Sequence, residues 1–220
     1  MNKFMKKTFV LVGFTIALAF LFSPKKTFAD FTPPEVEMSI IQDYTIPIEK
    51  VRTIQPAPLT TVNILNFVEK TKTRTTTDLL RTIYPSYSTA QLQNVTANLN
   101  QCATYTKSLG YKTKVTNGPL DYATLKNEIV NNRPVLGYLT ANGNYWIEQE
   151  TAIIIYGVQR IKYAGQPENL IYLYRSLNHG DNALFSGQLN NIQLLINESI
   201  IDPSANVTYS WTNTLHGFTK

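Results

Sequence analysis

The chain has 220 residues, 43% of them hydrophobic, so it is long enough for one domain with a substantial core. Removing residues 1–29, as argued below, would take away five of the 20 basic side chains and none of the 15 acidic ones, which leaves no net charge. A neutral chain without a basic run is not typical of proteins that bind nucleic acid or anionic lipid, and we expect neither partner. The single cysteine, Cys102, excludes an internal disulfide, so we expect stability to come from packing.

The N-terminal residues follow the three-part pattern of a secretory signal peptide. Three lysines precede the apolar run Thr8–Phe22, and the small residue Ala29 comes just before Asp30. The apolar run has 15 residues. A membrane-spanning helix needs about 20, so an anchor is the weaker alternative. We therefore predict that residues 1–29 are a cleaved signal peptide and that the protein is secreted, extracellular or associated with the cell envelope, without membrane attachment.

Residues 30–58 are predicted to form an extended N-terminal arm. Five prolines lie in this segment, and proline interrupts both helices and strand pairing. Beyond it, apolar residues recur on one helical face, which predicts a first helix from about Thr60 to Lys70 with Pro58 near its start. The domain proper is therefore expected to span residues 59–220.

Residues 59–131 are expected to be mainly helical. A threonine-rich segment caps a short predicted helix, Asp78–Ile83. A capping box at Ser88–Gln91 then begins the longest predicted helix, which ends before Gly110. A further helix is predicted over Tyr122–Asn131, and Pro134 stops it.

The C-terminal part, residues 134–218, is predicted to be mainly β. The best core strand is Glu150–Val158, whose unbroken apolar run is typical of a strand buried on both faces. Pro134–Thr140 and Leu170–Leu177 flank it as strands, the second joined by a hairpin, and Val207–Phe218 is a last strand. Helices followed by an antiparallel sheet define an α+β fold, with the core strand central in the sheet.

Five blocks of this sequence resemble, in order and spacing, the blocks of staphopains, which are secreted papain-like cysteine peptidases of Gram-positive bacteria. The blocks are Thr77–Pro85, Tyr122–Gly137, Thr151–Gly157, Leu170–Gly180 and Tyr209–Phe218. The resemblance spans most of residues 59–218. It implies a papain-like fold, in which a helical lobe faces a twisted antiparallel β-barrel-like lobe across a cleft.

The resemblance also implies where catalytic residues would stand. The family has a cysteine at the start of the first long helix, a histidine before the buried strand and an asparagine at the end of the next strand. The matching positions here are Pro56, Thr151 and Arg175, or Asn178 in a slipped register, and Lys50 replaces the glutamine that donates to the oxyanion. These residues cannot supply the thiolate and imidazole that the chemistry needs. We therefore predict that no catalytic residue is intact, and that Pro56, Thr151 and Arg175 converge on one groove.

One cysteine and two histidines remain as candidates for an active site. Cys102 is predicted to lie in the middle of a helix on the same face as Leu99, which is typical of a buried, inert thiol. His179 falls in a turn and is interpreted as solvated, and His216 is interpreted as a surface or partly packed residue. The alternative is an active peptidase with Cys102 as nucleophile and either histidine as base.

Residues near the strand ends are the candidate lining of the cleft. They are Tyr138, Trp146, Glu150, Tyr174, Asn178 and Trp211. Aromatic side chains are more often core than binding platform, so a core position is the competing interpretation. Glu148 and Glu150 would share one side of a strand, but two acids without a third hard ligand make a weak cation site, and we predict no metal and no cofactor.

Together these patterns predict a catalytically degenerate, secreted papain-like protein that binds a protein or peptide through the inherited cleft. Two alternatives stay open. One is an active cysteine peptidase with a misaligned site, and the other is a structural or adhesion module of the cell envelope. The position of Cys102 relative to the histidines distinguishes the predicted pseudoenzyme from the active peptidase.

Overall fold

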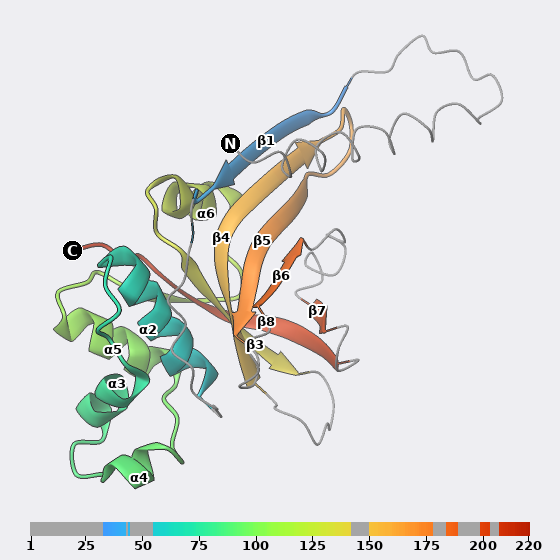
Figure 1. Cartoon of the computed structure of the whole chain (residues 1–220). Coiled ribbons are helices and arrows are strands. Elements are labelled where there is room, and N and C mark those ends of the chain that lie inside the picture. The colour runs from blue at the N-terminus through green and yellow to red at the C-terminus, as the bar shows by residue number, and fades with distance from the viewer. Residues whose placement is uncertain are drawn as a thin grey trace, which may run out of the picture. The chain divides into compact units, whose positions relative to one another are not determined.

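A computed structural model describes residues 33–42, 44, 55–141, 150–177, 184–188, 199–202 and 207–220. From Pro34 onward these residues belong to one compact unit that combines helices with an antiparallel sheet (Figure 1). The predicted α+β order is confirmed, with most helices before the central strands. The predicted signal peptide lies outside the described residues. Within the described part of the chain, no helix has the length and apolar character needed to cross a membrane.

The five described helices are α2 (Pro56–Val68), α3 (Thr76–Ile83), α4 (Thr89–Leu92), α5 (Leu99–Ser108) and α6 (Tyr122–Val130). Four of them, α3 to α6, begin at side-chain caps that the sequence indicates. In α3 and α6, the side chains of Thr75 and Asp121 accept a hydrogen bond from a backbone amide in the first turn. These starts agree with the predicted ones to within two residues, because a cap is a local feature of the sequence.

The longest predicted helix is two helices in the structure. Besides the capping box at Ser88, a second one joins Asn98 to Gln101, and the amide of Cys102 donates to the Asn98 carbonyl at 3.0 Å. A capping box satisfies the free amides of a helix start, so the second box begins a new helix, α5. Cys102 therefore lies in the first turn of α5 and not in the middle of a longer helix.

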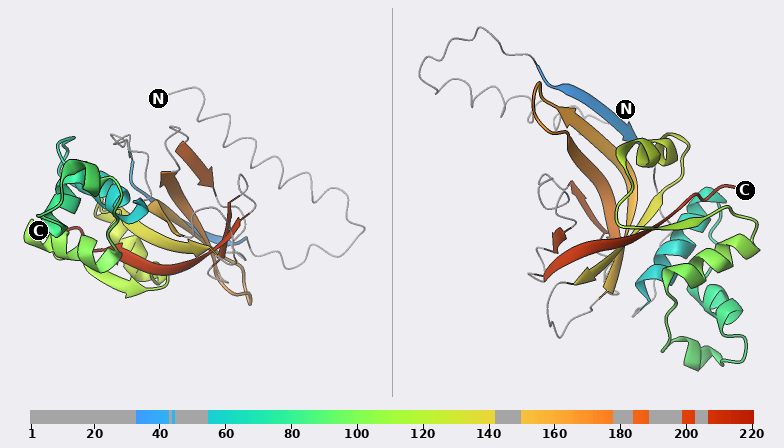
Figure 2. Two further views of the ribbon diagram at one scale, coloured as in Figure 1. Left: turned by 90° about the horizontal axis from the view of Figure 1, so that it is seen from below. Right: turned by 180° about the vertical axis from the view of Figure 1, so that it is seen from behind.

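Helix α2 is the longest described helix, at 13 residues, and it is buried almost all round. It begins at Pro56, earlier than the predicted Thr60, because proline is well suited to the first position of a helix. Residues 57–66 are all buried, and the helix packs against β3 and β4 on one side and α3 and α5 on the other. Figure 2 shows α2, α3, α4 and α5 grouped on one side of the sheet.

All the described strand pairs are antiparallel. The strands are β1 (Glu35–Ile40), β2 (Lys114–Asn117), β3 (Val135–Ala141), β4 (Glu150–Lys162), β5 (Asn169–Leu177), β6 (Leu184–Gln188), β7 (Ser199–Asp202) and β8 (Val207–His216). The main path runs β2-β8-β3-β4-β5-β6, with β1 added to β4 and β7 added to β8. Among the described strands this path does not close, so the barrel-like lobe is an open, twisted sheet.

Two strands lie outside the part of the chain that is predicted to be mainly β. β1 falls in the predicted arm and pairs with β4 from Glu35 opposite Lys162 to Ile40 opposite Gly157. β2 falls in the part predicted to be mainly helical and pairs with β8. Both are short edge strands held by distant partners, so no local periodicity identifies them.

The predicted core strand is central, as expected. Residues 151–155 of β4 are all buried, between β3 on one side and β5 on the other. Gly157 lies at a bulge opposite Leu173, and a Cβ atom there would stand 2.8 Å from the Leu173 Cδ1 atom. The close approach of the two strands therefore requires glycine at this point.

The cap of α5 has a measurable effect on stability. Replacing Asn98 by alanine removes the acceptor of the Gln101 amide, which lies 3.0 Å from the Asn98 Oδ1 atom. We expect Asn98→Ala to lower the free energy of unfolding by about 1 kcal/mol in urea denaturation. The matched control is Asn100→Ala, two residues later and also exposed. It should change the free energy of unfolding by less than about 0.5 kcal/mol. Equal losses in the two variants would contradict the capping role.

Candidate functional site

The start of α2 and the start of β4 lie at the same end of the described unit. Figures 1 and 2 agree on this placement, and α2 packs against β4. Pro56 is the first residue of α2, and Thr151 is the second residue of β4, where its side chain is buried. The site implied by the resemblance therefore has a helix start and a strand start, but with proline and threonine in the two positions.

The third matched position, Arg175, lies elsewhere along the sheet. The register of β4 and β5 sets Arg175 opposite Ile154, while Thr151 pairs with Leu139 on the other side of β4. Thr151 and Ile154 are three residues apart along β4, which corresponds to about 10 Å. Arg175 is therefore not a cross-strand neighbour of Thr151, and the convergence of all three positions on one groove stays a prediction. The alternative Asn178, together with Lys50, Trp146 and Glu148, lies outside the described residues.

Gln55, the residue before α2, connects the helix start to the segment that leads into α5. Its side chain is buried, and the Nε2 atom donates to the carbonyls of Leu92 at 2.8 Å and Val95 at 2.5 Å. It makes no capping hydrogen bond to its own helix. The amide therefore fixes the loop between α4 and α5 against the first turn of α2.

That loop forms one wall of a cavity of about 280 Å³ between the helices and the sheet. Residues 96–100 line it on the helical side, and Val115, Tyr138, Glu150 and Asn213 line it on the sheet side. Two of the predicted cleft-lining residues, Tyr138 and Glu150, thus lie together here. Asn213 and residues 96–100 were not predicted, although the second capping box is a signal that could have found the loop.

Tyr138 and Glu150 form the polar centre of this cavity. The Tyr138 hydroxyl donates to the Glu150 carboxylate across two adjacent strands. Burial raises the pKa of Tyr138, and the hydrogen bond to the carboxylate raises it further. The hydroxyl therefore stays protonated at neutral pH, as a donor that holds the carboxylate in place.

Trp211 belongs to the core and not to the cleft lining, which corrects the prediction. Only 2% of it is exposed, its ring meets the edge of Tyr172 with centroids 5.5 Å apart, and its indole N–H donates to Thr214 Oγ1 at 2.9 Å. Tyr174 is half-buried and packs against the same core. The competing interpretation of the aromatic residues is therefore the correct one for Trp211.

Cys102 is fully buried, as predicted, and it lies in the first turn of α5. A helix N-terminus favours a thiolate, but burial has the larger effect and raises the pKa of Cys102 from 9.0 to about 12. The nearby Thr61 offsets this only in part. The thiol is therefore neutral at physiological pH.

The described histidine does not complete a catalytic pair. His216 is buried, not on the surface, and its Nε2 atom lies 3.0 Å from Thr116 Oγ1. Its Nδ1 atom lies 3.9 Å from Glu128 Oε1, an ion-pair distance that is too long for a hydrogen bond. His179 lies outside the described residues. Among the residues that the structure describes, no thiol pairs with an imidazole, and no His, Cys, Asp and Glu cluster is suited to a metal ion.

Comparison with known proteins assigns the family. A sequence model of the staphopain peptidase family C47 matches residues 39–218, which is most of the chain and includes α2–α6 and β2–β8. No curated protein matches the chain. The helices followed by an antiparallel sheet agree with the papain-like fold of that family. This chain therefore belongs to the staphopain peptidase family C47 and has a papain-like fold.

Proposed function

We propose that this protein is a catalytically inactive staphopain homologue, exported from the cell, that acts by binding a peptide or protein. One observation carries the proposal. The single cysteine of the sequence is Cys102, buried in α5, while Pro56 occupies the first position of α2. A papain-like peptidase needs its thiol at that helix start, where an imidazole can activate it.

The protonation state of Cys102 supports the same conclusion. With a pKa of about 12, a thiol is ionised in about one molecule in 100,000 at pH 7. Cysteine peptidases depend on the thiolate, which a neighbouring imidazolium stabilises. His216, the histidine that the structure describes, has its Nε2 atom within hydrogen-bond distance of Thr116 and its Nδ1 atom within ion-pair distance of Glu128.

A binding role rests on the cavity between the helices and the sheet. Its volume of about 280 Å³ is near the lower limit for ligand pockets, so it suits one or two side chains of a peptide. Glu150 supplies an exposed carboxylate and Asn213 a side-chain amide at its wall. Such groups accept and donate hydrogen bonds to a peptide without any bond cleavage.

A peptidase assay tests the proposal. The purified protein, incubated with casein and with fluorogenic peptides under reducing conditions, is expected to release no product above the blank. The Cys102→Ser variant should behave identically, and an active staphopain serves as the positive control. Hydrolysis that Cys102→Ser abolishes would overturn the proposal and establish the alternative, an active peptidase with Cys102 as nucleophile.

A further inference from the structure

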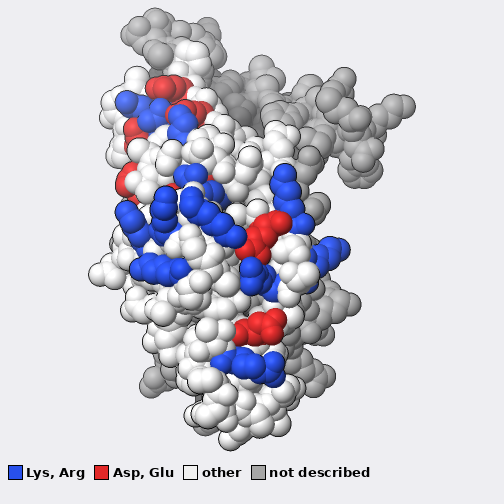
Figure 3. Space-filling view, turned by 90° about the vertical axis from the view of Figure 1, so that its left-hand side faces the viewer, with Lys and Arg blue, Asp and Glu red and all other residues white. Residues whose placement is uncertain are grey.

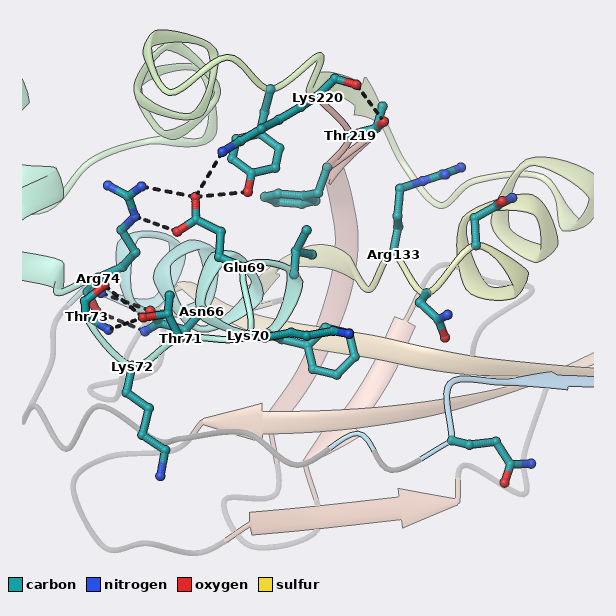
Figure 4. Close-up of a pocket in the computed structure, with 17 residues that line it drawn as sticks. Asn66, Glu69, Lys70, Thr71, Lys72, Thr73, Arg74, Arg133, Thr219 and Lys220 are labelled. Atoms are coloured by element: carbon teal, nitrogen blue, oxygen red, sulfur yellow. Dashed lines mark hydrogen bonds and ion pairs between the residues drawn. The ribbon is translucent and has the colours of Figure 1, made fainter.

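A second cavity lies at the opposite end of α2 from the candidate site (Figure 4). Its volume is about 1220 Å³, and it is lined mainly by the turn after α2, the turn after α6, and the C-terminal residues 218–220. A helix of 13 residues is about 20 Å long. The two cavities are therefore separate sites on one element, and the second has no counterpart in the matched catalytic positions.

The second cavity forms where three helices end. After α2, the amide of Thr71 donates to the Asn66 carbonyl at 2.9 Å, and the turns after α5 and α6 repeat this bond from Tyr111 and Arg133. Each of these ends is a Schellman motif, which satisfies the last carbonyls of its helix. Two of the last four carbonyls of each helix, counting its C-cap residue, are therefore hydrogen-bonded. The charged groups that face a ligand are side chains.

Those side chains are strongly basic. The cationic residues that line the cavity are Lys70, Lys72, Arg74, Arg133 and Lys220. Figure 3 shows Lys and Arg side chains gathered over the middle of one face of the molecule. Three helix ends carry a partial charge of about −0.5 each, which reduces the positive potential of five cations but does not reverse it. We call this surface, defined by the five residues above, the basic cavity.

Internal carboxylates neutralise part of the basic cavity. Glu69 accepts from Arg74 Nε at 2.8 Å and lies 3.6 Å from Lys220 Nζ (Figure 4). Outside the lining, Glu128 accepts from Arg133 Nε at 2.7 Å. Lys70 and Lys72 have no ion pair with any residue in the described part of the chain. With the α-carboxylate of Lys220 included, three carboxylates against five cations leave two positive charges in excess.

Lys70 occupies a backbone position that favours glycine. Its φ angle is +52°, in the left-handed region, and it follows the C-cap of α2. The equivalent position after α5 is Gly110, with a φ angle of +90°. A lysine here is less stable than glycine would be, by roughly 1 kcal/mol. The chain keeps a cationic side chain at the rim of the basic cavity despite this cost, which points to a role other than folding.

We propose that the basic cavity binds an acidic segment of a partner protein, whose carboxylates contact Lys70 and Lys72. The cavity exceeds the volume of about 300–1,000 Å³ that is typical of small-molecule pockets, which favours a polymer segment. A free arginine binds phosphate or carboxylate through two parallel hydrogen bonds, whereas lysine binds either group as a point charge. Arg74 directs two nitrogens at Glu69, at 2.8 and 3.1 Å, and Arg133 Nε donates to Glu128. The cations of the cavity without an ion pair in the described part of the chain are therefore Lys70 and Lys72, which bind carboxylates as point charges.

Fluorescence anisotropy with a labelled peptide of ten glutamates tests this inference on the purified full-length protein. We expect saturable binding at low ionic strength that weakens as salt is added, and no binding of the matched ten-glutamine peptide. The Lys70→Gly/Lys72→Gln variant should bind the acidic peptide about fivefold more weakly or worse. Arg81→Gln/Lys114→Gln removes two positive charges outside the basic cavity and should bind like the unmodified protein.

Thermal unfolding tests whether weaker binding results from a loss of folding. Lys70→Gly removes the backbone strain at a left-handed position and is expected to raise Tm slightly. Absence of binding to the glutamate peptide at low salt would overturn the inference, as would equal weakening by both double variants. Tighter binding of inorganic polyphosphate of equal charge, lost in the Lys70→Gly/Lys72→Gln variant, would assign the cavity to phosphate chains instead. These outcomes are independent of the peptidase assay, because the basic cavity shares no residue with the candidate site.

Discussion

Cys102 is expected to react with iodoacetamide at least about a thousandfold more slowly in the folded protein than in the unfolded chain at neutral pH. The thiolate is the reactive form, and a pKa of about 12 in place of 9.0 lowers its population by about three powers of ten. The side chain is also 0% exposed, so the reagent reaches it only after the protein opens. Mass spectrometry of the intact protein, sampled over time with and without denaturant, measures both rates.

An epoxide selective for activated cysteines should likewise leave the folded protein unlabelled. The Cys102→Ser variant provides the blank, since the sequence contains no other cysteine. Rapid, stoichiometric labelling of the folded protein at neutral pH would show that Cys102 is accessible and ionised. That result would contradict the burial described above and would favour an active peptidase.

Glu128→Ala is expected to lower the free energy of unfolding by about 3 kcal/mol. Glu128 is 6% exposed, and its carboxylate accepts from Arg133 Nε at 2.7 Å with His216 Nδ1 at 3.9 Å. Removing it leaves the half-buried Arg133 without its partner between α6 and β3, and an uncompensated buried charge is costly. Urea denaturation followed by circular dichroism measures the change.

Glu168→Ala is the matched control for this prediction. Glu168 is exposed and lies 3.5 Å from Arg160, so its loss should cost less than about 1 kcal/mol. Similar losses in the two variants would show that Glu128 has no special structural role. A loss below about 1 kcal/mol in Glu128→Ala would contradict the prediction directly.

The effect of Glu128 should also depend on pH. Burial raises the pKa of this carboxyl, but the adjacent His216 and Arg133 outweigh burial and hold it below its ordinary value of 4.5. A carboxyl whose pKa is lower in the folded state stabilises the protein above the unfolded pKa and loses that contribution as pH falls through the folded pKa. The stability difference between the unmodified protein and Glu128→Ala should therefore shrink as the pH is lowered from about 4.5.

Local patterns in the sequence predicted most of the secondary structure. The unbroken apolar run in β4 indicated a buried central strand, and the caps at Thr75 and Asp121 located the starts of α3 and α6. These signals depend on neighbouring residues, so they can be identified without knowledge of the fold. The second capping box at Asn98 is equally local, and overlooking it joined α4 and α5 into one helix.

The sequence predicted the residues of the candidate site that lie at the start of a helix or strand. Pro56 begins α2 and Thr151 lies at the start of β4, as the family resemblance implies. The place of Arg175 depends on the register of the β4–β5 hairpin, and the burial of Trp211 depends on which face of β8 meets the core. Register and facing are set by packing between distant segments, and a shift of one residue reverses them.

The sequence by itself determined that this chain is an α+β protein, and the family resemblance implies that its one cysteine is absent from the position that a papain-like peptidase requires. That conclusion needs only the order of the elements and the identity of a few residues. Only the tertiary structure revealed the basic cavity, because its cations come from the turn after α2, the turn after α6 and the last residue of the chain. The chain without residues 1–29 has no net charge, and although Lys70, Lys72 and Arg74 lie close together in the sequence, nothing in the sequence shows that Arg133 and Lys220 join them. Electrostatic potential depends on distances in space, and the fold had to bring the turn after α6 and the C-terminal residues to the end of α2 before Arg133 and Lys220 became neighbours of these three cations.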